Sequence, residues 1–380
     1  MDERVDQKYK HKHFPAAAVP KATQATPSNP EATVPNTAKD STDNQPLSMN
    51  ELIGSFAGFS IEGTAPEVEG VPPPPCPIAD LPDELLVHIL RDVAVLDVGD
   101  FVRLARVCKR LAYLVATENQ IWRRICLGSE TGFGGMHYHW QRAVTWEPLD
   151  PEDADEPEDR LLTPSELEAR RRDDSVASSL AFLDALYLSS WQSMFRLRPR
   201  IRFNGCYIST VNYLRSGQAS AHQTTWNTPV HIVTYYRYLR FFRDGTVISL
   251  LTTAEPAEVV GHLTREAVAL HAGSAMTHLP SAVMQSALKG RWRLSTAADK
   301  PEASVSEVEG DVTVETEGVG KYIYRLDLSL RSAGRGAKNT KLVWRGFYSY
   351  HTLTADWGVF QRRNEKSFFF SRVKSYGSGA

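Results

Sequence analysis

The chain has 380 residues, a formal net charge of −2 and a mean hydropathy of −0.33. This length predicts two compact domains rather than one, and the near balance of charge argues against a nucleic-acid-binding protein, which normally carries a basic face. The sequence holds no apolar run of about 18 residues that would span a membrane, no apolar signal segment at its start and no CxxC pair among its cysteines. We therefore expect a cytoplasmic or nuclear protein without a membrane segment.

Residues 1–75 are expected to form a disordered, Pro-rich tail. They are poor in large apolar side chains, and a segment that buries little apolar surface cannot offset the entropy cost of ordering it. Within this tail, the stretch MNELIGSFAGFSIEG (49–63) places four apolar side chains on one helical face: Leu52, Ile53, Phe56 and Phe59. This pattern indicates either a short docking helix or merely an apolar piece of the tail.

Residues 76–128 contain three short helical patterns. The first starts at Pro82 with two acidic residues beside it, a combination typical of helix starts. It carries one apolar stripe: Leu85, Leu86, Ile89, Leu90 and Val93. The second pattern covers residues 99–118 and the third covers residues 119–127. So small a unit is marginal as an independent fold, and its apolar positions cover more than the single face that an internal core would use.

Residues 129–199 are interpreted as a linker. An acidic run at 150–160 (DPEDADEPEDR) predicts a solvated loop, and the charged stretch SELEARRRDDS after it predicts a helical insert. Residues 176–197 are apolar at helical spacing and stop before Pro199, which predicts one rigid helix that joins the two halves of the chain.

From residue 200 to residue 376 the apolar pattern changes to strict alternation, which is typical of strands. About eight or nine such segments, without helical crossovers between them, predict an antiparallel barrel or sandwich. Asp244-Gly245 is a pair that favours a two-residue hairpin turn. The expected fold class is therefore α+β: a small three-helix domain and a linker helix, followed by an antiparallel β domain.

The sequence contains none of the common cofactor or hydrolase signatures, so we expect no cofactor and no catalytic activity. His137 and His139 have no matching ligands nearby, which favours structural or surface roles over metal binding. Cys108 lies on an apolar helix face, which favours a buried thiol over a nucleophile. In YYRYLRFF (235–242), alternation places Arg237 and Arg240 on opposite faces of a strand, which favours barrel core over base stacking.

The three helical patterns of residues 76–128 resemble an F-box. Leu81-Pro82 opens the first helix, the VCKR sequence at 107–110 lies in the second, and Trp122 opens the third. In that family the helices dock onto a Skp-family adaptor, which sits on a cullin that carries a RING subunit. The resemblance implies that eight positions form or support the adaptor interface: Leu81, Pro82, Leu85, Ile89, Val107, Cys108, Leu111 and Trp122. It also places Lys109 and Arg110 toward the rim of this interface.

Residues 191–376 are similar to the F-box only protein nine family and its fungal counterparts, most distinctively in YYRYLRFFRDGT. Animal members carry a tetratricopeptide-like repeat before the F-box, whereas residues 1–75 here are too polar and Pro-rich for one, as in the fungal members. The resemblance implies a non-catalytic substrate receptor of an SCF-type ubiquitin ligase, which presents substrate through its β domain. Such a subunit contributes proximity rather than bond chemistry.

Other interpretations stay open. Gly290-x-Trp292 before a strand is similar to the opening of lipocalin barrels, which hold small apolar ligands, and the F-box would then control turnover or localisation. A barrel filled by its own side chains is the more frequent outcome for eight strands. An F-box protein can also act through the adaptor alone, outside any ligase. A further set of basic residues is available to meet a phosphate: Arg240, Arg243, Arg345, Arg362, Arg363 and Lys366.

Overall fold

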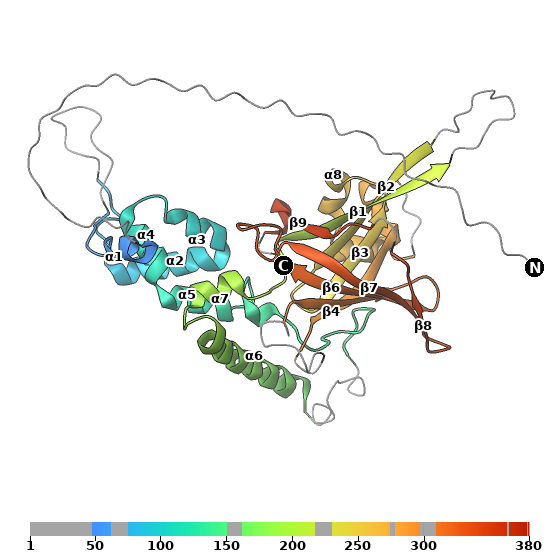
Figure 1. The fold of residues 1–380 in the computed structure, drawn as a ribbon, viewed down its shortest axis with the longest axis horizontal. Coiled ribbons are helices and arrows are strands. Elements are labelled where there is room, and N and C mark those ends of the chain that lie inside the picture. Colours follow the sequence, from blue (N-terminus) through green and yellow to red (C-terminus); the bar gives the residue numbers. More distant parts are fainter. Residues whose placement is uncertain are drawn as a thin grey trace, which may run out of the picture. The chain divides into compact units, whose positions relative to one another are not determined.

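The structure is a computed structural model (Figure 1), and it describes residues 48–61, 75–149, 162–216, 230–273, 278–296, 299, 309–362, 365–377 and 379. Most of the tail predicted over residues 1–75 lies outside the described residues, namely 1–47 and 62–74. The acidic run at 150–160 also lies outside them. Residues 48–61, which were also assigned to the disordered tail, instead contain a helix. The predicted division of the chain into four segments stays a prediction.

The first half of the described chain is helical. Its elements are α1 (Met49–Gly54), α2 (Asp83–Leu96), α3 (Val98–Leu104), α4 (Lys109–Thr117), α5 (Asn119–Leu127), the short 3₁₀ helix η1 (Phe133–Gly135), α6 (Pro164–Leu186) and α7 (Trp191–Leu197). Helix α2 begins directly after Pro82, with two acidic residues in its first turn that interact favourably with the helix dipole. Helix α7 packs against α5 (Figure 1), so the linker returns to the helical unit.

The second predicted helix, residues 99–118, is in fact two helices. Helix α3 ends in a turn in which the Val107 amide donates to the Leu104 carbonyl, and Cys108 then adopts an extended conformation with φ −151° and starts α4. The break changes the direction of the chain, so that Phe101 of α3 and Leu111 of α4 both reach one core. Because the apolar spacing continues through the turn, the sequence pattern did not reveal it.

The single helix predicted over residues 176–197 is also broken. Helix α6 ends at Leu186, and Leu188 and Ser189 take positive φ values of 51° and 55°. The Ser190 hydroxyl then accepts a hydrogen bond from the Ser193 amide and caps α7. Left-handed backbone at two non-glycine residues ends a helix, so the linker consists of two helices rather than one rod.

Nine antiparallel strands form one sheet in the described part of the second half. They are β1 (Gly205–Ser216), β2 (Val230–Phe241), β3 (Thr246–Thr252), β4 (Ala287–Leu294), β5 (Asp311–Glu317), β6 (Tyr322–Arg331), β7 (Lys341–His351), β8 (Asp356–Val359) and β9 (Phe368–Arg372). Their order is β6-β5-β4-β3-β2-β1-β9-β7-β8, and β6 also pairs with β7. Eight strands therefore close into a barrel, and β8 is an extra strand on the side of β7. The predicted α+β fold class with an antiparallel β domain is confirmed.

The turn between β2 and β3 is longer than the two residues predicted. The Phe242 amide donates to the Thr246 carbonyl, and the Gly245 amide donates to the Phe242 carbonyl, so three residues form the loop. Gly245 has a φ of +83°, which is the left-handed conformation that closes a three-residue hairpin loop. The Asp-Gly pair thus marks the hairpin correctly, but the turn type differs.

A group of short helices between β3 and β4 was not predicted. They are α8 (Pro256–Val259), η4 (Val260–His262), α9 (Arg265–His271) and η5 (Pro280–Ser286). They cover the outer face of the strands before them, in a second apolar cluster that includes Tyr238, Ile248, Leu250 and Val268. Strands β3 and β4 still pair directly and antiparallel, so the helices form an excursion from the barrel and not a crossover.

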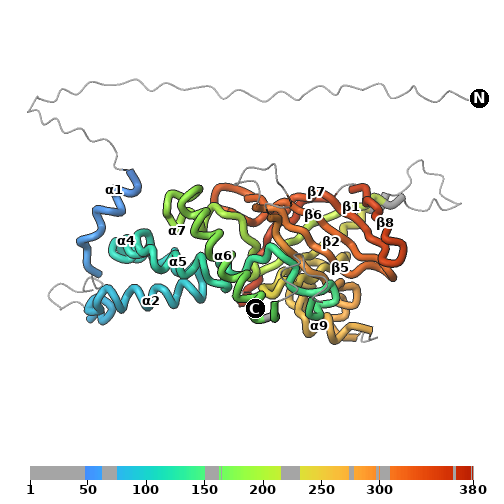
Figure 2. Tube along the Cα trace, turned by 90° about the horizontal axis from the view of Figure 1, so that it is seen from below, coloured from blue at the N-terminus to red at the C-terminus, as the bar shows by residue number. Residues whose placement is uncertain are grey.

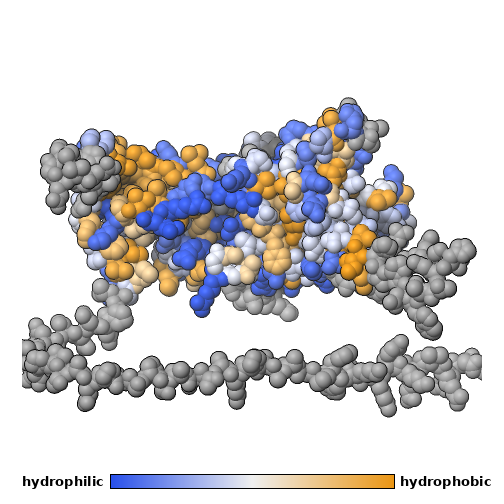
Figure 3. All heavy atoms as spheres, turned by 90° about the horizontal axis from the view of Figure 1, so that it is seen from above, coloured by the Kyte–Doolittle hydropathy of each residue, from blue (hydrophilic) through white to orange (hydrophobic). Residues whose placement is uncertain are grey.

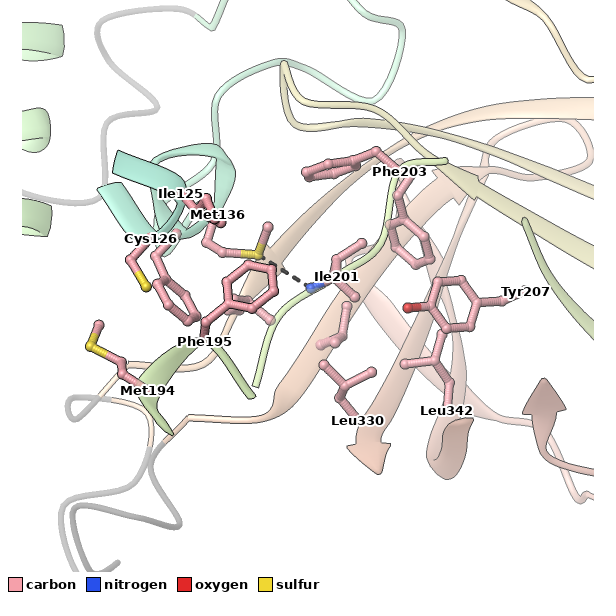
Figure 4. Packing of buried hydrophobic residues seen from close by; sticks show 14 of the residues in the cluster. Ile125, Cys126, Met136, Met194, Phe195, Ile201, Phe203, Tyr207, Leu330 and Leu342 are labelled. Carbon is pink, nitrogen blue, oxygen red and sulfur yellow. Dashed lines mark hydrogen bonds between the residues drawn. The ribbon is translucent and has the colours of Figure 1, made fainter. Parts of the chain in front are cut away.

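One apolar core runs from the helical unit into the barrel. Figure 4 shows side chains of α5 and α7, among them Cys126 and Phe195, on one side of the junction and side chains of the barrel, among them Tyr207, on the other. Between them the Ile201 amide contacts the Met136 sulfur at 3.3 Å. A shared core of this kind holds the two parts in one arrangement, since neither side can move without opening packed contacts.

A buried polar network reinforces the same junction. Arg198, which follows α7 and is 1% exposed, donates hydrogen bonds to both carboxylate oxygens of Glu309, at 2.9 and 2.7 Å. It also donates hydrogen bonds to the Ser179 hydroxyl at 2.8 Å and to the Tyr138 hydroxyl at 3.0 Å. Four segments distant in sequence therefore meet at one guanidinium. Burial raises the pKa of Tyr138 far above its usual range, so the phenol stays neutral.

Candidate adaptor-binding surface

The apolar stripe of α2 is divided between two faces. Leu86 and Leu90 are buried in the core, whereas Leu85 and Ile89 are 49% and 46% exposed. Successive residues of a helix point about 100° apart, so Leu85 and Ile89, four residues apart, share a face that turns away from the core. Helix α2 therefore has one apolar face that the chain covers itself and one that the chain leaves open.

Two further predicted positions are also exposed. Pro82 at the start of α2 is exposed, and Val107 in the turn before α4 is 70% exposed. An ion pair between Arg110 of α4 and Asp83 of α2 holds the first turns of these two helices next to each other. We call Pro82, Leu85, Ile89 and Val107 the open face. Figure 3 shows apolar side chains gathered at this helical end of the molecule.

The other four predicted positions lie deeper. Leu81 and Cys108 are half-buried, and Leu111 and Trp122 are buried in the core. The Trp122 indole N–H donates to the Val115 carbonyl at 2.8 Å, and its ring lies against the rings of Phe101 and Phe195. Leu111 and Trp122 thus support the helices from inside. Direct contact of any of the eight positions with an adaptor stays a prediction.

The polar groups near the junction are held in place by the fold. The His137 ring contacts the Arg243 carbonyl and the Trp292 ring, and burial lowers the pKa of His137. Burial raises the pKa of Cys126 and of Cys206 to about 12, so both stay protonated thiols. Among the residues that the structure describes, no three His, Cys, Asp or Glu side chains gather as a metal-ligand set, and no helix combines the length and apolar character needed to cross a bilayer.

Side chains fill the interior of the barrel. Trp292 is fully buried, and its ring lies 5.7 Å from the Phe241 ring and 5.9 Å from the Phe203 ring. Toward the other end, Arg237 points inward, lies over the Trp344 ring and pairs with Glu365 at 3.3 Å. This interior is a packed core with one ion pair, which does not favour the small-ligand barrel.

The basic residues considered for phosphate binding do not form one patch. Arg240 is buried beneath the helices that follow β3, where it contacts the Leu263 carbonyl. Arg243 donates to the Glu130 carbonyl at 2.6 Å, at the junction with the helical unit. Arg345 pairs with an aspartate at the start of β5, and Arg362 donates to the Arg345 carbonyl. Arg363 lies outside the described residues.

A helical unit with an exposed apolar face, joined to a packed barrel, is typical of a protein-binding module. Comparison with protein families specifies this class: residues 78–128 match the F-box-like family, and residues 181–347 match the F-box only protein C-terminal region. The chain therefore contains an F-box-like domain and, after it, an F-box only protein C-terminal region, and the resemblance to F-box proteins predicted from the sequence is confirmed.

Two curated relatives are fungal. F-box protein pof7 of Schizosaccharomyces pombe is 30% identical over 210 residues, which cover 55% of this chain and 52% of that protein. F-box protein HRT3 of Saccharomyces cerevisiae is 33% identical over 191 residues, which cover 48% of this chain and 45% of that protein. The chain thus spans about half the length of the curated relatives it matches. No solved structure matches.

Proposed function

We propose that the chain is the substrate-recognition subunit of an SCF-type ubiquitin ligase. In this role the open face binds a Skp-family adaptor, and through it a cullin and a RING subunit. The observation that carries the proposal is the exposure of Leu85 and Ile89 on a helix of an F-box-like domain, because paired aliphatic side chains on one open helix face are a feature of protein interfaces. The two fungal relatives described above are both named F-box proteins.

The barrel would present the substrate. The shared core and the Arg198 network fix the barrel relative to the helical unit, so a substrate on the barrel would be held at a set orientation to the rest of the ligase. The chain would raise the effective concentration of substrate lysines near the conjugating enzyme and would itself supply no acid, base or nucleophile. We place this activity in the cytoplasm, the nucleus or both.

The test is binding of the full chain to a purified Skp-family adaptor, with Leu85→Asp beside it. Leu85→Asp should weaken binding roughly 100-fold or more, since an unpaired carboxylate would be buried in an apolar interface. The matched control is Leu270→Asp on α9, where Leu270 is 45% exposed, and it should bind like wild type. Circular dichroism checks that each variant folds.

The proposal fails if the folded wild-type chain does not bind the adaptor, or if Leu85→Asp binds as tightly as wild type. Addition of cullin to the preformed complex tests the ligase step separately. Recovery of cullin with the chain supports the SCF assignment. Binding of the adaptor without cullin would instead indicate a role through the adaptor alone.

A further inference from the structure

Residues 48–61, which we call the strap, dock onto the helical unit at α4. The strap begins with α1, whose start is fixed by a reciprocal capping box between Ser48 and Glu51. Figure 2 shows α1 and the residues after it beside α4, in agreement with the contacts between these helices. A helix of six residues is too short to be stable alone. Its order therefore depends on what it packs against.

Two basic residues of α4 hold the strap. The Lys109 ammonium lies 4.1 Å from the centre of the Phe59 ring and 5.9 Å from that of the Phe56 ring. Arg110 donates a hydrogen bond to the Ala57 carbonyl at 2.7 Å. The strap therefore contacts both basic residues that the resemblance places toward the rim of the adaptor interface. It covers positive charge that would otherwise border the open face.

Arg110 links the strap to the first turn of α2, next to Pro82 of the open face. The Arg110 guanidinium that contacts Ala57 also pairs with Asp83 in the first turn of α2, and Lys109 lies two residues after Val107 of the open face. The strap itself leaves apolar side chains uncovered: Met49 is 70% exposed, Leu52 is 40% exposed and Phe59 is 42% exposed. A docked segment that still exposes three large apolar side chains next to an apolar surface extends that surface.

The size of a stable interface points the same way. Such an interface buries about 800 Å² on each partner and involves roughly 20–30 residues a side. The four residues of the open face supply only part of that, so an adaptor that covers them must also cover their neighbours. The strap is a neighbour that is apolar and already contacts the adjacent cations.

We propose that the strap is a second part of the adaptor-binding surface, in which Met49, Leu52 and Phe59 contact an apolar surface of the same adaptor molecule that covers the open face. This inference rests on the proposed function. The strap lies before residue 78, where the F-box-like domain begins, so the adaptor-binding surface would include residues outside that domain.

The test is the double variant Met49→Asp/Leu52→Asp in the full chain, measured against the purified adaptor by surface plasmon resonance. Both side chains are exposed, so the variant should fold like wild type by circular dichroism. We expect the dissociation constant to rise roughly tenfold or more, mainly through faster dissociation. The matched control is Leu270→Asp/Val319→Asp, two exposed positions of the β domain, which should stay within about twofold of wild type.

Unchanged affinity of Met49→Asp/Leu52→Asp would overturn the inference, and so would tighter binding, because a strap that hinders the adaptor is the opposite of one that contacts it. These outcomes are distinct from failure of the proposed function, in which wild type itself does not bind. Hydrogen exchange gives a second readout: the amides of residues 51–57 should exchange more slowly in the complex. Equal exchange rates with and without adaptor would also overturn the inference.

Discussion

Trp122→Ala should destabilise the whole described fold and not only the helical unit. Trp122 is 2% exposed and lies at the point where α3, α5 and α7 meet, with ring centres 5.5 Å from Phe101 and 5.7 Å from Phe195. Truncation of a buried tryptophan to alanine costs about 3–5 kcal/mol of unfolding free energy through lost burial and the cavity left behind. The unpaired Val115 carbonyl adds to this cost. Trp122→Phe removes the same hydrogen bond and part of the ring volume, and it should cost about 1–3 kcal/mol.

The assay is urea unfolding of the full chain, followed by far-ultraviolet and near-ultraviolet circular dichroism. Because one core spans the junction, loss of helix signal and loss of the barrel's aromatic signal should coincide in wild type and shift together in Trp122→Ala. Leu353→Ala is the control, since Leu353 is 73% exposed in the turn between β7 and β8 and its truncation should change stability by no more than about 0.5 kcal/mol. A loss below about 1 kcal/mol for Trp122→Ala, or two separate transitions in wild type, would refute the reasoning.

Three other outcomes follow from the buried groups. Arg198→Met should cost about 3–5 kcal/mol in urea unfolding, because it leaves the Glu309 carboxylate buried without its partner; a change below about 1 kcal/mol would mean that water already reaches the pair. Burial lowers the pKa of His137, so below about pH 6.5 the unfolded state binds a proton that the folded state does not bind. The free energy of unfolding should therefore fall as the pH drops below about 6.5. His137→Phe should flatten that slope, and an unchanged slope would assign it to other groups. Gly245→Ala should cost about 1–2 kcal/mol because Gly245 has a φ of +83°, whereas Gly261→Ala, where a Cβ meets nothing within 4 Å, should leave the melting temperature nearly unchanged.

Strands that bury only one face were predicted well from the sequence. β5 along its length and β4 from Gly290 onward alternate between buried and partly exposed residues, so their pattern has period two. β3 is buried on both faces over Thr246–Leu250, because the helices after it form a second layer. Those helices are three to seven residues long, which is too short for a periodic signal. They were therefore missed, although the strand beneath them was found.

The site was predictable as a set of positions but not as a surface. Leu85 and Leu86 are the same residue type, and which of them faces the core depends on where α5 and α7 lie. That placement is set by contacts between Trp122 and Phe195, which are distant in sequence. The strap was visible as an apolar pattern, but its docking depends on the cations of α4. Single-sequence patterns carry no information on such long-range pairings.

The last strand of the barrel in chain order, β9, lies between β1 and β7: Gly205 of β1 pairs with Arg372, and Lys341 of β7 pairs with Phe369. Of the described barrel strands, the one that closes the ring therefore leaves the ribosome last, on the order of ten seconds after β1 at ordinary translation rates. Until β9 is made, β1 and the first residues of β7 lack a partner strand, although β8 already pairs with the end of β7. Such unpaired edges invite association with other nascent chains. A chain truncated before Phe368 would lack β9, and its barrel would keep a permanent gap. We expect cellular quality control to recognise such a chain.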